Sequence, residues 1–133
     1  MYMPGAFTHQ GVLPNMPVGK RYPGQFGVTY WDKAQLEKAL QPVIDFQVRY
    51  KVPIFIGEFS ASRFSGSDGD QYVTDLIRVF EHYNWSWAYH DFRGSPVWDA
   101  ELTTNSVSSE SSQRDQNAPR MQILIKAFHG ALH

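Results

Sequence analysis

The chain has 133 residues, of which 42% are hydrophobic and 15% aromatic, so it can bury one core and lies outside the disordered class. Its formal net charge of -1 creates no field of a single sign, which argues against nucleic acid or an anionic membrane surface as a partner. The absence of cysteine excludes disulfides and thiolate-bound zinc, and no apolar run approaches the roughly 20 residues of a membrane span. We therefore expect residues 1–133 to form one domain or a piece of one.

The first 30 residues predict one strand and one long loop. Residues 1–11 begin as though already inside a strand and turn at Pro4 and Gly5. Residues 12–30 contain three prolines and three glycines, which predict an irregular loop with one short extended piece in FGVTY. A loop of that length in a compact domain is more often functional than idle.

A helix and a strand are predicted next. The helix begins at Asp32, its N-cap, and ends near Tyr50, with Pro42 kinking it or starting its second half. The buried face of this helix is expected to hold Leu36, Leu40, Val43 and Gln47. The run VPIFI within residues 51–60 is too short and too uniformly apolar for a surface strand. It predicts a parallel strand that is covered on both sides.

The pattern of strand and helix then repeats. A second helix is expected to begin at Asp68 or Asp70, as its cap, and to end near Tyr83, with a buried stripe of Val73, Leu76, Ile77 and Phe80. A third strand is expected in WSWAYHDF. A polar segment, residues 94–117, follows and includes SSESS, which alone would suit a disordered linker. The last helix is expected to begin at Asn117 and Pro119, where proline suits the first turn, with a stripe of Met121, Leu124, Ile125, Phe128 and Leu132.

The alternation of strands and helices predicts a parallel sheet with helices on its outside. In such folds the loops at the carboxyl ends of the strands build the functional site. Glu58, His9 and residues 89–93 all lie at those ends. We therefore expect them to gather in one mouth.

Glu58 is a single carboxylate at the end of an apolar strand. Burying an unpaired carboxylate is costly, so the group either has a partner or is kept for its reactivity. An ion pair with Arg63 is the structural alternative to a functional role.

Two histidines lie near the same strand ends. His9 and His90 could ligate a metal together with Glu58 or Asp91, but no H-E-x-x-H or H-x-H spacing supports this. Polar or sugar-binding histidines are the preferred interpretation. No metal and no cofactor are predicted.

Three segments resemble, in this order, the last three βα units of glycoside hydrolase family 5: MYMPGAFTHQG, WDKAQLEKALQPVIDFQVRYKVPIFIGEFSASRF and WSWAYHDFRGSPVWDAE. This family of cellulases, mannanases and related enzymes is built on a (β/α)8 barrel. The resemblance spans nearly the whole chain and implies a partial TIM barrel, strands six to eight. A complete barrel needs roughly 250 residues, so we expect a C-terminal fragment.

The resemblance also implies roles for individual residues. Glu58 occupies the position of the family's catalytic nucleophile, and Tyr2 that of the tyrosine that hydrogen-bonds the nucleophile. The family's eighth strand commonly supplies a tryptophan on which a sugar ring stacks. His90 takes that position here. Trp87 and Trp98 are therefore the candidate platforms. The substrate-binding residues we expect are therefore His9, Trp87, His90 and Trp98.

The implied activity is retaining hydrolysis of a β-1,4-glucan, in which a second carboxylate about 5 Å from the nucleophile acts as acid and base. In the family that glutamate belongs to an Asn-Glu pair on the fourth strand, and this chain has no Asn-Glu dipeptide. We expect little activity from an isolated monomer unless Asp91, Asp99, Glu101 or a second chain supplies the acid. The alternatives are a fragment that only binds carbohydrate, an assembling half-barrel, and a purely structural module.

The expected partner is a β-linked polysaccharide or oligosaccharide. Three strands cut from a barrel would expose two edges and an apolar face, so we also expect a homo-oligomer. Members of the family are often secreted, although no charged-then-apolar leader follows Met1.

Overall fold

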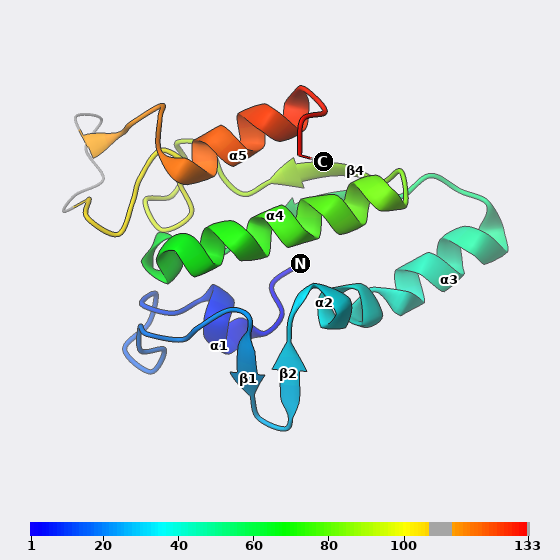
Figure 1. Ribbon diagram of the computed structural model, residues 1–133, viewed down its shortest axis with the longest axis horizontal. Helices are drawn as coiled ribbons and strands as arrows, with labels where there is room; N and C mark the ends of the chain where they lie inside the picture. The colour runs from blue at the N-terminus through cyan, green and yellow to red at the C-terminus, as the bar shows by residue number, and fades with distance from the viewer. Residues whose placement is uncertain (107–112, 133) are drawn as a thin grey trace.

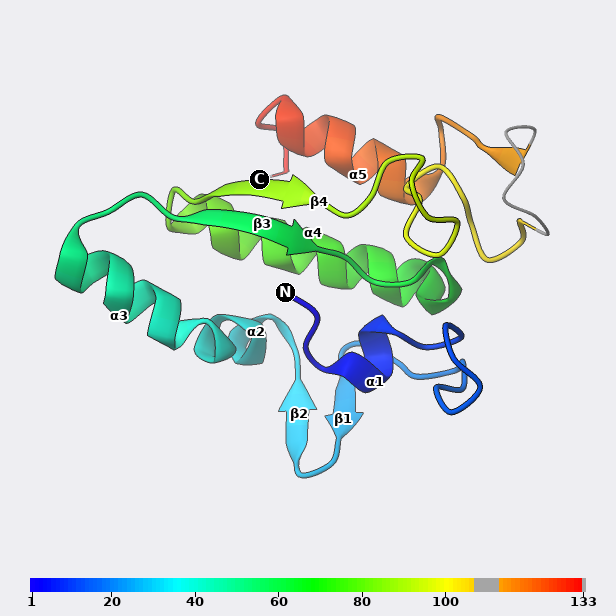
Figure 2. The same cartoon turned by 180° about the vertical axis from the view of Figure 1, so that it is seen from behind.

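The computed structural model describes residues 1–106 and 113–132, and the run SSESS lies outside these residues (Figure 1). The long helix α4, Gly66–His82, runs through the middle of the molecule. The strands β3, Phe55–Phe59, and β4, Ser86–Tyr89, lie side by side along it, as Figure 2 shows. The helix α5, Pro119–Phe128, packs against α4.

β3 and β4 form a parallel pair, as the sequence predicts, with Ile56 opposite Trp87. The pairing continues past the strands, because the His90 N–H donates to the Phe59 carbonyl. The Met1 amino group donates to the Glu58 carbonyl, so the start of the chain lies alongside β3. The predicted first strand is not formed: residues 1–3 belong to no strand or helix.

The predicted irregular loop in residues 12–30 contains a hairpin that the sequence reasoning missed. A short helix, α1 (Gly5–Thr8), comes first. Strands β1, Gly24–Phe26, and β2, Thr29–Trp31, then pair antiparallel. The stretch FGVTY therefore contains the end of β1, a turn at Gly27 and Val28, and the start of β2, and Gly27 has a φ of +61° that favours glycine.

The predicted helix after Asp32 forms in two pieces, α2 (Lys33–Ala39) and α3 (Gln41–Tyr50). The Asp32 carboxylate accepts a hydrogen bond of 2.9 Å from the Gln35 N–H, which confirms the predicted cap. Pro42 lies in the first turn of α3, where its missing N–H costs nothing. Lys51 ends the helix in the left-handed conformation.

The start of α4 differs from the prediction. The helix begins at Gly66, directly after the short 3-10 helix η1 (Arg63–Ser65), and no side chain caps it. Asp68 and Asp70 lie inside the helix and have other partners: Asp68 binds Arg21, and Asp70 binds Arg120 at 2.9 Å. Both carboxylates, which the local sequence pattern predicts as helix caps, thus form ion pairs with residues distant in the sequence.

The core lies between α4 and the elements around it. Each large apolar side chain buried there contributes roughly 1.5–3 kcal/mol. The predicted stripe of α4 is fully buried, together with aromatic residues from other elements: Phe7, Phe59, Tyr72, Val73, Leu76, Ile77 and Phe80. In α5 the stripe is confirmed only in part, because Leu124 is buried whereas Phe128 is 68% exposed.

β3 is covered on one face only, contrary to the prediction. Phe59 is 0% exposed and points to α4, whereas Phe55 is 66% exposed. The uncovered face is turned to the viewer in Figure 2, and no helix of the described residues lies over it. None of the helices in residues 1–106 and 113–132 is long and apolar enough to span a membrane.

Candidate active site

Glu58 is exposed near the carboxyl end of β3, and its partner is Tyr2. The Tyr2 hydroxyl donates a hydrogen bond of 2.5 Å to Glu58 Oε1. This bond lowers the pKa of Glu58 below its ordinary value; desolvation opposes the effect and the nearby His90 adds to it. Glu58 is therefore held as a carboxylate.

Tyr2 shows the complementary effect. Its burial, and next its bond to Glu58, raise the pKa of the Tyr2 hydroxyl far above the usual value. The phenol therefore keeps its proton and remains a hydrogen-bond donor. A nucleophilic carboxylate must be ionised and accessible. The neutral phenol of Tyr2 holds the Glu58 carboxylate in its ionised form, and Glu58 remains exposed.

Other aromatic rings pack next to Tyr2. Tyr2 lies 5.3 Å from His9 and 5.6 Å from Trp98, and His9 lies 5.1 Å from Trp98, measured between ring centroids. His90 approaches Trp98 at 6.1 Å. We call Tyr2, His9, His90 and Trp98 the aromatic cluster. The structure thus brings together five of the six predicted site residues, counting Glu58.

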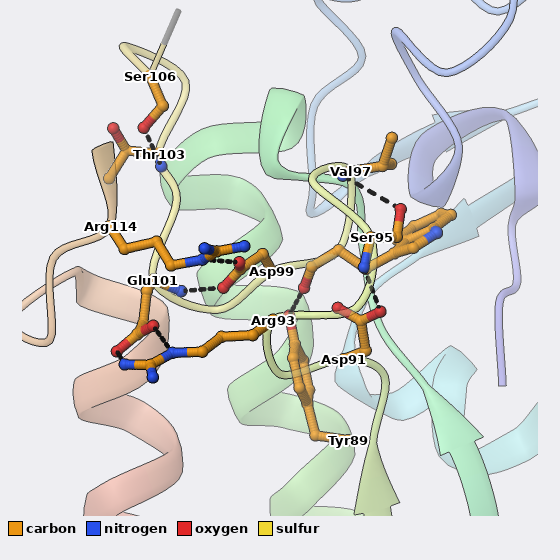
Figure 3. Close-up of polar contacts among 11 residues, drawn as sticks. Tyr89, Asp91, Arg93, Ser95, Val97, Asp99, Glu101, Thr103, Ser106 and Arg114 are labelled. Atoms are coloured by element: carbon orange, nitrogen blue, oxygen red, sulfur yellow. Dashed lines mark hydrogen bonds and ion pairs between the residues drawn. The ribbon is translucent and has the colours of Figure 1, made fainter. Parts of the chain in front are cut away.

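Hydrogen bonds within the loop after β4 fix Trp98. The Tyr89 hydroxyl donates to the Trp98 carbonyl at 2.9 Å, and the Asp91 N–H donates to the same oxygen at 3.3 Å. Asp91 Oδ2 accepts the Ser95 N–H at 2.7 Å, which closes the turn before the tryptophan (Figure 3). Trp98 is therefore presented by a loop held at both ends.

Trp87, the other predicted platform, lies elsewhere. Its ring stacks on Phe128 at 5.3 Å and meets the edge of Phe59 at 5.6 Å. These contacts place Trp87 among the side chains between β4 and α5. It makes no ring contact with the aromatic cluster in the described part of the chain.

The carboxylates considered as a substitute acid are engaged in the fold. Asp99 Oδ2 binds Arg114 Nε at 2.7 Å, and the Asp99 side chain is 0% exposed. Glu101 binds Arg93 through both oxygens, at 2.7 and 3.1 Å, and is 1% exposed. Figure 3 shows both pairs on the loop after β4. Buried carboxylates neutralised in this way are structural groups.

Arg63, the ion-pair partner considered for Glu58, binds elsewhere. The Arg63 guanidinium turns to another loop and donates to the carbonyls of Thr103 and Ser106, at 2.6 and 2.8 Å. Arg63 forms no ion pair with Glu58. No group of three or more potential metal-ligating side chains occurs within residues 1–106 and 113–132.

Two further residues support the site: the sequence analysis missed Thr8 and placed Tyr89 at the site without giving it a role. Thr8 joins His9 and Tyr2 through its hydroxyl, and Tyr89 holds Trp98. No motif marks Thr8. Tyr89 carries a weak signal, because it ends a strand in the predicted mouth.

Comparison with known proteins gives a match in structure only. No family model matches the sequence. No curated protein matches it either.

Several solved structures share the fold. An endoglucanase is 25% identical with a TM-score of 0.69, and the match covers 92% of this chain and 37% of that one. Cel5A from Thermotoga maritima, in complex with cellobiose, is 21% identical with a TM-score of 0.69 over 92% and 36% of the two chains. A glycoside hydrolase is 17% identical with a TM-score of 0.73 over 95% and 39%.

The chain thus spans a little over a third of the length of these proteins. Its two small sheets form no closed barrel within the described residues. The chain has the fold of part of a barrel glycosidase.

Proposed function

We propose that the chain supplies the nucleophile side of a retaining β-1,4-glucan hydrolase of the family-5 type. The observation that carries this proposal is the 2.5 Å bond from Tyr2 to Glu58 at the carboxyl end of a parallel strand, with the aromatic cluster beside it. The structural likeness to endoglucanases supports it. One of these neighbours, Cel5A from Thermotoga maritima, is described in complex with cellobiose and in complex with mannotriose.

In this mechanism Glu58 attacks the anomeric carbon and the glycosidic C–O bond breaks, which leaves a covalent glycosyl-enzyme. The leaving oxygen takes a proton from a general acid. Water then attacks the anomeric carbon and gives its proton to the deprotonated acid, now acting as base, while the bond from the sugar to Glu58 breaks. Tyr2 holds the Glu58 oxygen in place and stabilises the carboxylate when it leaves.

The sugar would rest on the exposed part of the aromatic cluster. Trp98 offers a ring face for stacking, and His9 and His90 offer polar atoms to sugar hydroxyls. Trp87 packs against Phe59 and Phe128, so the platform role falls to Trp98.

The general acid is the missing part. Asp99 and Glu101 are buried in ion pairs, and Asp91 Oδ2 accepts the Ser95 N–H. We therefore propose that the second carboxylate comes from outside the described residues. Its absence is worth a factor of about 10² to 10⁴ in rate.

We further propose that the chain self-associates through the uncovered face of β3, where Phe55 is 66% exposed. Contact of this apolar side chain with water is unfavourable, and a second copy can remove it.

The experiment compares two substrates. Dinitrophenyl β-cellobioside has a leaving group that needs no proton, whereas soluble β-1,4-glucan releases an alcohol that does. We expect cleavage of the aryl cellobioside, loss of that cleavage in Glu58→Gln, and glucan hydrolysis slower than in a whole barrel by about 10² to 10⁴. Glu81→Gln on α4 is the matched control.

Two outcomes would contradict the proposal. Aryl cellobioside cleavage that survives Glu58→Gln would assign the nucleophile elsewhere. Binding of cellobiose without any cleavage would favour the carbohydrate-binding alternative. A mass by light scattering that stays monomeric at every concentration would refute the self-association.

A further inference from the structure

The Thr8 hydroxyl contacts both the backbone of Tyr2 and the ring of His9. Thr8 is the last residue of α1 and is 0% exposed. Its Oγ1 lies 2.9 Å from the Tyr2 carbonyl oxygen and 2.9 Å from His9 Nδ1. The Pro4 carbonyl is further away, at 3.4 Å.

A hydroxyl has one hydrogen to donate and lone pairs to accept with. The two carbonyls can only accept, whereas Nδ1 of a neutral histidine either donates or accepts. The Pro4 carbonyl already accepts the N–H groups of Phe7 and Thr8. The Tyr2 carbonyl has no other donor among the described residues.

One arrangement satisfies all three groups. If Thr8 donates to the Tyr2 carbonyl, its lone pair is left to accept a hydrogen from His9 Nδ1. The reverse arrangement, in which Thr8 donates to Nδ1, leaves the Tyr2 carbonyl without that bond. A buried hydroxyl with two partners favours the arrangement that makes both bonds.

We propose that Thr8 is a positioning residue that holds His9 with its proton on Nδ1 and so presents Nε2 as a hydrogen-bond acceptor to a sugar hydroxyl. The hydrogen bond from a sugar hydroxyl to Nε2 rests on the proposed function. The position of the proton on Nδ1 does not depend on it. Nε2 of His9 makes no hydrogen bond within the described residues, and the ring is held between Tyr2 and Trp98.

The same hydroxyl also acts on the nucleophile side. It binds the backbone of Tyr2, whose phenol donates to Glu58. One buried threonine therefore aligns the acceptor for the sugar with the donor to the carboxylate. This explains why a polar side chain is fully buried beneath exposed and half-buried site residues.

The tautomer can be read directly by long-range proton–nitrogen NMR of the 133-residue chain labelled with ¹⁵N-histidine. The pH is set to about 8.5, roughly two units above the ordinary histidine pKa. His9→Gln assigns the signal. We expect the protonated nitrogen of His9 to be Nδ1 in the wild type and in Thr8→Ser, and to become Nε2 in Thr8→Val, which keeps the side-chain shape.

The wild-type spectrum alone can overturn the inference, whether or not a variant folds. A proton on Nε2 of His9 in the wild type contradicts it, as does a Thr8→Val protein with native-like spectra and an unchanged tautomer. The ring of His82, on the far end of α4 against Tyr83, should not respond to either variant.

Cellobiose added to the same sample tests the role toward sugar separately. We expect a shift of the His9 Nε2 resonance that saturates with cellobiose and is weaker in Thr8→Val. No shift at Nε2, with the proton still on Nδ1, would refute the role toward sugar and count against the proposed function. In that case the bond between Thr8 and His9 would still be established.

Discussion

Replacing Arg114 by methionine should destabilise the chain strongly, because Asp99 would lose its counter-charge in a dry environment. The Asp99 side chain is 0% exposed, and Arg114 Nε lies 2.7 Å from its carboxylate. Methionine fills much of the arginine stem but cannot neutralise the charge.

The magnitude follows from the burial. Removing one partner of a buried ion pair costs about 3–5 kcal/mol. Arg114 is itself 21% exposed, so water can reach part of the site, and we expect the lower end, about 3 kcal/mol. The free energy of unfolding of a small domain is roughly 5–15 kcal/mol, so this loss is a large fraction of it.

Urea denaturation followed by tryptophan fluorescence measures this loss. Asp99→Asn combined with Arg114→Met removes the stranded charge and should recover part of the stability. Arg49→Met on the exposed face of α3 is the matched control and should change the free energy of unfolding by less than about 0.5 kcal/mol. A loss below about 1 kcal/mol in Arg114→Met would refute the reasoning and reopen Asp99 as a proton donor.

Four further predictions concern Glu58, the core and the N-cap of α2. Tyr2→Phe should raise the pKa of Glu58 toward its ordinary value in a ¹³C-carboxyl titration, because the bond that lowers it most is lost. Because the folded pKa of Glu58 is lowered, its contribution to stability is present above the unfolded pKa and lost as the pH falls through the folded one; an acid unfolding curve unchanged in Glu58→Gln would contradict this. Phe59→Ala should cost about 3–5 kcal/mol in urea denaturation, with a smaller loss in Phe59→Leu, and equal losses would contradict its packing role. Asp32→Ala should cost about 1 kcal/mol and Asp32→Asn little; a harmless alanine would show that the cap contributes nothing.

The sequence predicts the local elements well where one pattern dominates. Asp32 and Pro42 mark the two helix starts, and the apolar stripe of α4 is buried as its spacing requires. The resemblance also pairs Tyr2 with Glu58, which the structure joins. In each of these cases, nearby residues or a known motif determine the local structure.

Other features depend on partners far along the chain. Asp68 and Asp70 resemble caps but bind Arg21 and Arg120, which local spacing cannot reveal. The apolar run of β3 indicates burial on both faces, yet periodicity cannot tell which elements are present to cover them. Thr8 carries no motif at all, because its role depends on the fold bringing three groups to one hydroxyl.

The central claim is that Glu58 is a glycosidase nucleophile, and covalent trapping tests it most directly. Dinitrophenyl 2-deoxy-2-fluoro-β-cellobioside needs no acid to react, and its fluorine slows release of the glycosyl-enzyme. Mass spectrometry should show one fluorocellobiosyl unit added to the wild type, located on Glu58 by peptide mapping, and none on Glu58→Gln. A wild-type chain that stays unlabelled at saturating reagent, or a label on another residue, would contradict the account.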